Sequence, residues 1–141
     1  MNGKKRRMFA LARRYRYAAA HTLRSPRLSA AENVQLYGPC AHPSGHGHDY
    51  QVEVILTADA LRDDVLFGHG QLDDLVAEHV TPRLAYRDLD SGFGPEFITT
   101  GENLAAAIHG MLRPHVPGML DVSIHLVETE KNSFAFHGEA T

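Results

Sequence analysis

The chain has 141 residues, of which 43% are hydrophobic and 22% are charged, and its formal net charge is -3. This length and composition fit one compact domain and exclude a second hydrophobic core. No apolar run approaches the roughly 20 residues that a membrane span needs. Met8 to Ala12 is too short and too closely flanked by arginine to be a signal-peptide core, so we expect a cytoplasmic protein.

The amino terminus is strongly basic. Seven of the fourteen Lys and Arg residues lie in the first sixteen positions, where no Asp or Glu occurs. Residues 1–7 have nothing to bury and are predicted to form a disordered basic arm, followed by a single domain over residues 8–141. Such an arm could bind nucleic acid. A solvated terminus is the favoured interpretation, because interleaved aromatic residues and a basic body are lacking.

Two strands separated by a loop are predicted for the first half of the domain. Aromatic residues and alanines alternate with arginine over Phe9–His21, and no capping signal precedes them, which favours a strand over a helix. Residues 22–47 are rich in Ser, Pro, Gly and Asn and indicate a long surface loop. Between Tyr50 and Leu56 apolar residues alternate with polar ones, as in a half-buried strand that extends back through the preceding histidines.

Two helices are predicted to follow. Apolar residues recur at steps of three and four between Leu72 and Leu84, which is the pattern of an amphipathic helix. Thr99 and Glu102 form a capping-box pair at the start of a second helix, and Pro114 ends it.

The chain closes with two predicted strands, at Leu120–Leu126 and Ser133–His137, separated by a turn. The order strand, strand, helix, helix, strand, strand predicts an α+β fold. In such a fold both helices cover one face of an antiparallel sheet, and the other face is exposed or covered by a partner subunit.

Histidine is unusually frequent, with ten residues, and its spacing indicates a metal site. His46 and His48 lie two residues apart at the start of a predicted strand, so their side chains point to the same side and can share one ion. A catalytic zinc site needs three protein ligands and an open position, and His21 is the natural third ligand if the two strands pair. The alternative is an accidental or merely hydrogen-bonded motif. Other histidines available as ligands are His42, His69 and His125.

Cys40 is the single cysteine, which excludes an intramolecular disulfide and suits a reducing compartment. Its thiolate could act as a base, a nucleophile or a metal ligand, because nearby cationic charge lowers a thiol pKa. The alternative is a small apolar filler. The position in a glycine- and proline-containing loop beside the candidate metal ligands favours a functional role.

Glu128 ends a strongly alternating strand. A carboxylate there can accept two N–H donors from a guanidine-like ring edge, although an exposed strand-end Glu is the simpler alternative. Glu102 and Thr100 are equally explained as parts of a helix start. None of these side chains identifies a substrate by itself.

Five segments carry a resemblance to a known family. They are Tyr17-Ala-Ala-Ala-His21, Leu36-Tyr-Gly-Pro-Cys40, Gly45-His-Gly-His-Asp-Tyr50, Thr100-Gly-Glu-Asn103 and Val127-Glu-Thr129. Together they resemble the 6-pyruvoyl-tetrahydropterin synthase and 6-carboxytetrahydropterin synthase family over nearly the whole folded part. The most specific feature is a cysteine followed by a GHGH(N/D)Y-like run, and the five residues between Cys40 and His46 look more like the pyruvoyl branch.

The resemblance implies the tunnelling fold (T-fold), a four-stranded antiparallel sheet with two helices inserted between strands 2 and 3. Its subunits assemble into an oligomeric barrel, usually a homo-hexamer made of two trimers. The implied Zn²⁺ ligands are His21, His46 and His48. The implied catalytic thiolate is Cys40, and the implied substrate-binding residues are Glu128, Thr100 and Glu102.

The reaction that the resemblance implies is a zinc-dependent lyase reaction. It converts 7,8-dihydroneopterin triphosphate to a 6-pyruvoyl- or 6-carboxy-tetrahydropterin with loss of triphosphate. The biopterin, queuosine and folate routes share this substrate class, so the pathway stays open. Arg24 and Arg27 could contact the phosphates, or they are solvated loop charges.

One departure from the family concerns proton transfer. The family has an Asp-His pair where the run Leu84–Leu89 has Ala85 and Tyr86, and Gln71 replaces another acidic or amide residue. Ala85 cannot orient a partner, and Tyr86 titrates near pH 10, so it is a poor base at neutral pH. The candidates for a rewired proton relay are Tyr86, Asp88 and His69. The alternatives to an active lyase are a diverged paralogue that acts on another pterin or purine-like compound, and a non-catalytic pterin-binding protein.

Overall fold

The computed structural model describes residues 5–138. Its strands are β1 (Phe9–His21), β2 (His46–Ala58), β3 (Arg87–Asp88), β4 (Asp121–Val127) and β5 (Ser133–Phe136). Its helices are α1 (Ala30–Tyr37), α2 (His69–His79), α3 (Thr81–Leu84), α4 (Leu89–Phe93) and α5 (Gly101–Leu112). Two short 3₁₀ turns, η1 (Gly38–Ala41) and η2 (Arg113–His115), complete the elements.

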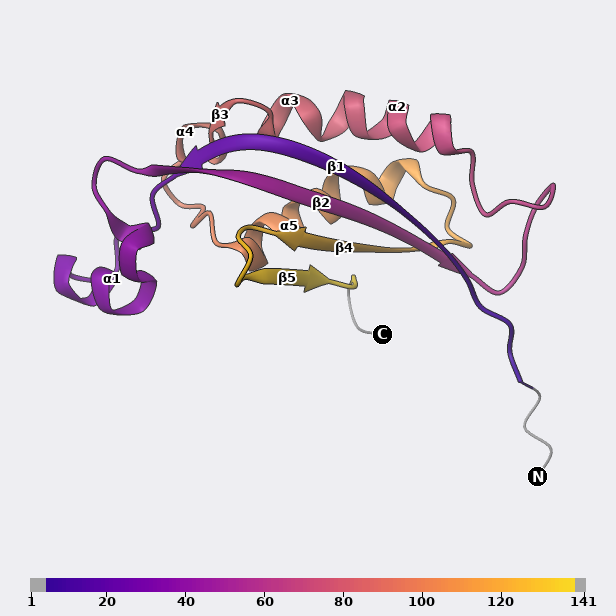
Figure 1. Ribbon diagram of the computed structural model, residues 1–141, viewed down its shortest axis with the longest axis horizontal. Helices are drawn as coiled ribbons and strands as arrows, with labels where there is room; N and C mark the ends of the chain where they lie inside the picture. Colours follow the sequence, from indigo (N-terminus) through magenta and orange to yellow (C-terminus); the bar gives the residue numbers. More distant parts are fainter. Residues whose placement is uncertain (1–4, 139–141) are drawn as a thin grey trace.

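The strands form one sheet in the order β3-β1-β2-β4-β5 (Figure 1). β1, β2, β4 and β5 are the four antiparallel strands that the sequence predicts, and the two-residue β3 adds to the edge of β1 in parallel. The long β1–β2 hairpin pairs Phe9 with Ala58 at one end and His21 with His46 at the other. Residues directly opposite each other share a face of the sheet, so this register places His21 beside His46.

The core lies between one face of the sheet and the helices α2 and α5, which cover it. Alternate residues of β2 and β4 are buried there, whereas the residues between them face away from the helices. Burying each such Leu or Val side chain contributes about 1.5–3 kcal/mol relative to leaving it in water. The fully buried side chains include Val52, Val54, Leu56, Leu72, Val76, Leu104, Ile108, Leu112, Ile124 and Leu126.

The prediction of an irregular loop over residues 22–47 is wrong, because α1 and η1 lie within it. Ser29 caps α1 and Glu32 completes a capping box, a Ser-x-x-Glu signal that the sequence does contain. The buried Asn33 donates its side-chain amide to the carbonyl oxygens of Ser25, Leu28 and Ser29 and accepts the Ser25 N–H. This network orders the segment that leads to Cys40.

Two helix boundaries also differ from the prediction. The expected single helix from Leu72 to Leu84 is divided into α2 and α3, with Pro82 in the first turn of α3, where its missing N–H costs least. The cap of α5 is Thr100 rather than Thr99, and its hydroxyl accepts the N–H of Asn103. Thr99 instead donates its hydroxyl proton to Asp90, and both residues belong to the candidate site described below.

Residues 1–4 of the predicted basic arm lie outside the described part of the chain. Of the three arm residues described, Arg6 contacts Asp59 at 3.1 Å and Arg7 lies over the Phe9 ring. Disorder of the arm therefore stays a prediction. Across residues 5–138, none of the helices has the length and apolar character needed to cross a membrane.

An ion pair ties β1 to α2. Arg13 donates two hydrogen bonds of 2.8 Å to Asp73, and the Tyr15 hydroxyl adds a third of 2.7 Å. These donors, Arg13 first, lower the pKa of Asp73. A depressed carboxyl pKa contributes stability that is present above the unfolded-state value and is lost as the pH falls through the folded-state value.

We therefore expect Asp73→Asn to lower the melting temperature modestly at pH 7, because the ion pair is partly exposed. The difference between variant and wild type should shrink below about pH 4, where the Asp73 carboxyl of the unfolded chain is protonated. Thermal unfolding followed by circular dichroism at several pH values measures this. The exposed neighbour Asp74→Asn is the control, and a pH-independent difference would contradict the ion-pair account.

Candidate functional site

Three histidine rings converge where β1 ends and β2 begins. The Nε2 atom of His46 lies 3.0 Å from Nε2 of His21 and 2.6 Å from Nε2 of His48. The β1–β2 register sets His21 opposite His46, and the two-residue repeat of β2 sets His48 on the same face. The cluster that the sequence predicted from spacing therefore forms.

The proton on the His21 ring is placed by a backbone carbonyl. Nδ1 of His21 lies 3.0 Å from the oxygen of Thr99, and a carbonyl can only accept, so Nδ1 carries the proton and Nε2 presents a lone pair to the cluster. Only 1% of His21 is exposed, and burial lowers its pKa to about 4. The ring is therefore neutral at pH 7.

The other two rings are also held in the neutral form. Burial lowers the pKa of His48, and burial followed by the neighbouring His48 lowers that of His46. Nε2 of His46 contacts both other rings, whereas its Nδ1 is buried without a hydrogen-bond partner in the described chain. One proton cannot satisfy both close N···N contacts, so lone pairs face one another. A cation would satisfy all three nitrogens, and the donor set therefore fits a metal.

Cys40 brings a fourth potential ligand to the three rings. Its Sγ and the ligand atoms of the histidines all lie within 4.8 Å of one another. Cys40 sits in η1, and its carbonyl accepts the N–H of Leu23 at 2.7 Å, which fixes the turn against the end of β1. Burial, and then the charge of Glu128, raises the thiol pKa. Imidazole nitrogens with one sulfur form a ligand set typical of zinc.

A cavity of about 230 Å³ opens beside Cys40. Every residue that was predicted to bind substrate lines it. Its lining residues are Leu23, Leu36, Tyr37, Cys40, Thr100, Gly101, Glu102, Glu128, Asn132 and Phe134.

Glu128 is the buried acid of this cavity, with 5% of its surface exposed. Its Oε1 lies 3.9 Å from Nε2 of His48, and its Oε2 is buried with no hydrogen-bond partner among residues 5–138. Burial raises the pKa of Glu128, and nearby Glu102 adds to this rise, whereas His46 and a side-chain hydrogen bond with Asn132 oppose it. An unsatisfied buried acceptor costs about 1–3 kcal/mol, and a ligand with N–H donors would remove that cost.

Thr100 and Glu102 border the same cavity from the start of α5. The Thr100 hydroxyl oxygen accepts the helix N–H of Asn103, so its own proton is free to be donated elsewhere. Glu102 is exposed, in contrast to Glu128. The two carboxylates therefore differ in burial and can take different roles.

The three relay candidates line other cavities of the described chain. Tyr86, which is 90% exposed, and Asp88 line a cavity of about 530 Å³ at the β1 edge of the sheet, and His48 of the histidine cluster lines it too. The Asp88 carboxylate also caps α4 by accepting the N–H groups of Asp90 and Ser91. His69 begins α2 and lines a third cavity, of about 260 Å³. None of the three lines the cavity that contains Cys40.

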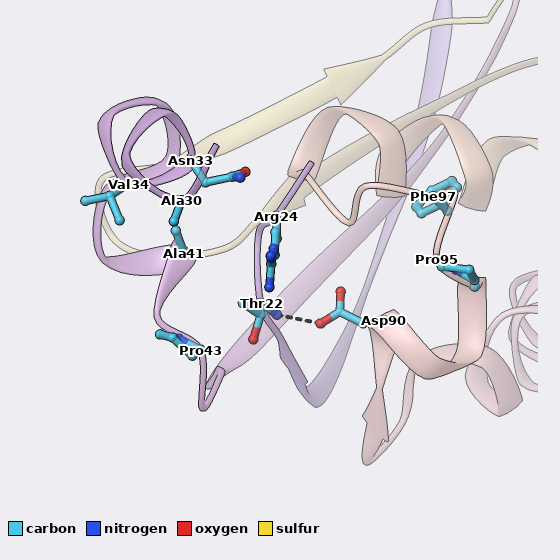
Figure 2. Close-up of a pocket in the computed structure, with 11 residues that line it drawn as sticks. Thr22, Arg24, Ala30, Asn33, Val34, Ala41, Pro43, Asp90, Pro95 and Phe97 are labelled. Carbon is cyan, nitrogen blue, oxygen red and sulfur yellow. Dashed lines mark hydrogen bonds between the residues drawn. The ribbon is translucent and has the colours of Figure 1, made fainter. Parts of the chain in front are cut away.

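Another cavity, of about 440 Å³, is lined in part by the segment that follows β1 (Figure 2). Thr22 and Arg24 line this cavity, whereas Leu23 between them lines the one beside Cys40. Side chains of an extended segment alternate in direction, which explains the division. Arg24 is therefore separated from Cys40 by its own backbone, and contact of Arg24 or Arg27 with phosphates stays a prediction.

Asp90 is a site residue that the sequence did not reveal. Its two oxygens accept the Thr22 N–H at 2.6 Å, drawn in Figure 2, and the Thr99 hydroxyl at 2.8 Å. Thr22 follows His21, and Thr99 holds the His21 ring, so Asp90 fixes this ligand from two sides. Asp90 and Thr22 are 68 residues apart in the sequence, so no local sequence pattern indicates their contact.

The sequence and the fold of this chain are similar to those of known proteins. Residues 10–139 match the family described as 6-pyruvoyl tetrahydropterin synthase. The chain is 36% identical over 128 residues to the 6-pyruvoyl tetrahydrobiopterin synthase of Poecilia reticulata, with 87% of this chain and 86% of that protein covered. The Drosophila melanogaster protein of the same description is 34% identical over 134 residues, with 91% and 79% covered. The structure of Caenorhabditis elegans 6-pyruvoyl tetrahydropterin synthase superposes with a TM-score of 0.85 at 28% identity, covering 96% of this chain and 99% of that one.

Proposed function

Because the chain belongs to the 6-pyruvoyl tetrahydropterin synthase family and is a lyase of pterin synthesis, we propose that it acts on 7,8-dihydroneopterin triphosphate in a zinc-dependent reaction. The product is a 6-pyruvoyl-tetrahydropterin formed with loss of triphosphate, or a 6-carboxy-tetrahydropterin formed with loss of triphosphate and acetaldehyde. One observation carries this proposal: three neutral imidazoles and a thiol converge beside a cavity that is also lined by Glu128, a buried carboxylate whose Oε2 has no hydrogen-bond partner in the described chain.

Glu128 binds the pterin ring in this proposal. The aminopyrimidine edge of a pterin offers adjacent N–H donors, and the free Oε2 of Glu128 offers the matching acceptor. Binding there replaces an unsatisfied buried oxygen with charge-assisted hydrogen bonds, which contribute about 1.5–3 kcal/mol each. A ring anchored at Glu128 lies in the cavity that Cys40 also lines, beside the histidine cluster.

His21, His46 and His48 hold the metal, and Cys40 moves the proton. Zinc in this position would supply Lewis-acid polarisation of a substrate side-chain hydroxyl. Cys40 takes a proton from the substrate side chain onto Sγ. Burial opposes formation of the thiolate, so Cys40 depends on nearby cationic charge to be a base at neutral pH.

The same chain is proposed to assemble into a homo-hexamer of two trimers. Within residues 5–138 the outer strands β3 and β5 each leave one edge without a partner strand. Unpaired edges are suited to pairing between subunits, which would close the sheets into a barrel.

A diverged activity is the second candidate, and the residues Ala85 and Tyr86 favour it. The family's Asp-His pair is absent at this place, and Tyr86 lies apart from the cavity of Cys40. A paralogue acting on another pterin or purine-like compound, or a non-catalytic pterin-binding protein, would keep Glu128 and the histidine cluster while lacking that pair.

The proposed function predicts turnover that depends on Glu128. Zinc-loaded protein is incubated with 7,8-dihydroneopterin triphosphate, and the products are separated by chromatography with mass detection. We expect a pyruvoyl or carboxy product, and a loss of about ten- to hundredfold in kcat/KM for Glu128→Gln, which weakens a charge-assisted anchor. Exposed Glu130→Gln, two residues further along, is the matched control. Unchanged substrate with fully metallated wild type would contradict the lyase, and retained pterin binding would then favour the non-catalytic alternative.

A further inference from the structure

The cavity beside Cys40 is lined by two aromatic side chains, Tyr37 and Phe134, to which the proposed function gives no role. Phe134 of β5 is half-buried and lines this cavity together with Gly101, the first residue of α5. Phe134 lies opposite Leu126 in the β4–β5 register, and Glu128 is two residues beyond Leu126. Phe134 and Glu128 therefore project from neighbouring strands toward the same side of the sheet.

Gly101 makes room for the Phe134 ring. A Cβ atom added at position 101 would overlap Cγ, Cδ2 and Cε2 of that ring, so the ring lies directly against the backbone of the first turn of α5. The backbone of Gly101 has no positive φ that would require glycine. Glycine is also a weak helix former, and an alanine would favour α5. Close approach of the ring is therefore the physical reason for glycine at this position.

Phe134 is placed where its ring can contact the face of a flat heterocycle in the cavity. The polar groups of the cavity, Glu128 above all, can satisfy the hydrogen-bonding edge of such a ring, but they cannot contact its two apolar faces. An aromatic side chain supplies a flat surface of low conformational entropy for this purpose. Phe134 is anchored by Gly101 behind it and borders the cavity in front.

We propose that Phe134 contacts the flat face of the heterocycle in this cavity and is a specificity-determining residue, with Gly101 setting the depth of the ring. This inference rests on the proposed function, because it takes Glu128 as the anchor of the heterocycle's edge. Phe134 affects binding of the ring system and takes no part in the proton transfer at Cys40.

The test uses the zinc-loaded full chain and neopterin, which carries the pterin ring without the triphosphate. Binding is titrated by quenching of pterin fluorescence. We expect Phe134→Leu to raise the Kd about two- to tenfold, in the range of a lost aromatic contact. Phe134→Tyr should bind as wild type does. Phe136→Leu is the matched control, because Phe136 lies two residues along the same strand and packs against His109 outside this cavity.

Gly101 gives an independent measurement. Gly101→Ala should weaken neopterin binding by displacing the Phe134 ring, and it should have little further effect in the Phe134→Leu background. Melting temperatures of all variants separate loss of binding from loss of folding.

Four results would overturn the inference. Equal losses in Phe134→Leu and Phe136→Leu would show a general effect on β5. Tighter binding by Phe134→Leu would show that the ring occupies space that the heterocycle needs. Absence of neopterin binding in metallated wild type would overturn the proposed function and this inference with it, whereas binding that requires Glu128 but not Phe134 would overturn this inference alone.

Discussion

Zinc affinity is expected to fall by about two orders of magnitude or more in His46→Ala. His46 is the central ring of the cluster, with its Nε2 within 3.0 Å of Nε2 of His21 and 2.6 Å from Nε2 of His48. Structural zinc sites bind with about 10–16 kcal/mol shared among four ligands, so one ligand represents roughly 3 kcal/mol. Turnover should fall with metal occupancy at limiting zinc.

The measurement for His46→Ala is competition for Zn²⁺ against a chromophoric chelator, with metal content checked by mass spectrometry. His42→Ala is the control, because His42 lies in the same segment but is exposed and contacts Ser44. Wild-type zinc affinity in His46→Ala would contradict a metal site at these three rings. An equal loss in His42→Ala would indicate an effect on the whole segment.

Turnover is expected to fall by about 10²- to 10⁴-fold in Cys40→Ala, while neopterin binding is retained. This is the usual range for removing a positioned acid or base. Glu128 and the histidine nitrogens do not depend on the thiol for their positions: His21 is held by Thr99 and Glu128 by the end of β4. The loss should therefore lie in kcat rather than in KM.

Zinc affinity of Cys40→Ala separates two roles for the thiol. Sγ lies within 4.8 Å of the three histidine ligand atoms, so it could be a fourth ligand as well as a base. A pure base predicts nearly unchanged zinc affinity, whereas a ligand predicts a loss comparable to that in His46→Ala. Ala41→Ser is the control for the turn, because Ala41 lines the cavity of about 440 Å³ and not the one beside Cys40. Full activity of Cys40→Ala would exclude both roles.

Tyr86 lies in the segment where this chain departs from the family's Asp-His pair. It has a positive φ of 55°, and its N–H donates to the carbonyl of Ala18 at 2.7 Å, which attaches the β3 segment to the edge of β1. Its side chain is almost fully exposed. In the described chain, the segment that carries Ala85 and Tyr86 therefore extends the edge of the sheet. None of its residues lines the cavity beside Cys40.

Much of the fold followed from local patterns. Period-two alternation identified the strands, and period-three-and-four spacing identified the helical region between β2 and β4, because burial on one face imposes these periods. The His-x-His spacing and the end of β1 together predicted the cluster of three histidines, since strand pairing brings those ends together. The loop prediction over residues 22–47 was wrong because the bonds of buried Asn33 override a composition rich in turn formers.

The sequence by itself determined the sheet, the helical layer and the identity of the three imidazoles, since each depends on neighbours in the chain or on one hairpin. Only the tertiary structure decided which acidic and aromatic side chains lie beside these imidazoles. Glu128 is buried with one unpaired oxygen whereas Glu102 is exposed, and the Phe134 ring lies against Gly101, where a side chain would overlap it. These properties arise from contacts between distant elements, and no local period in the sequence encodes such contacts.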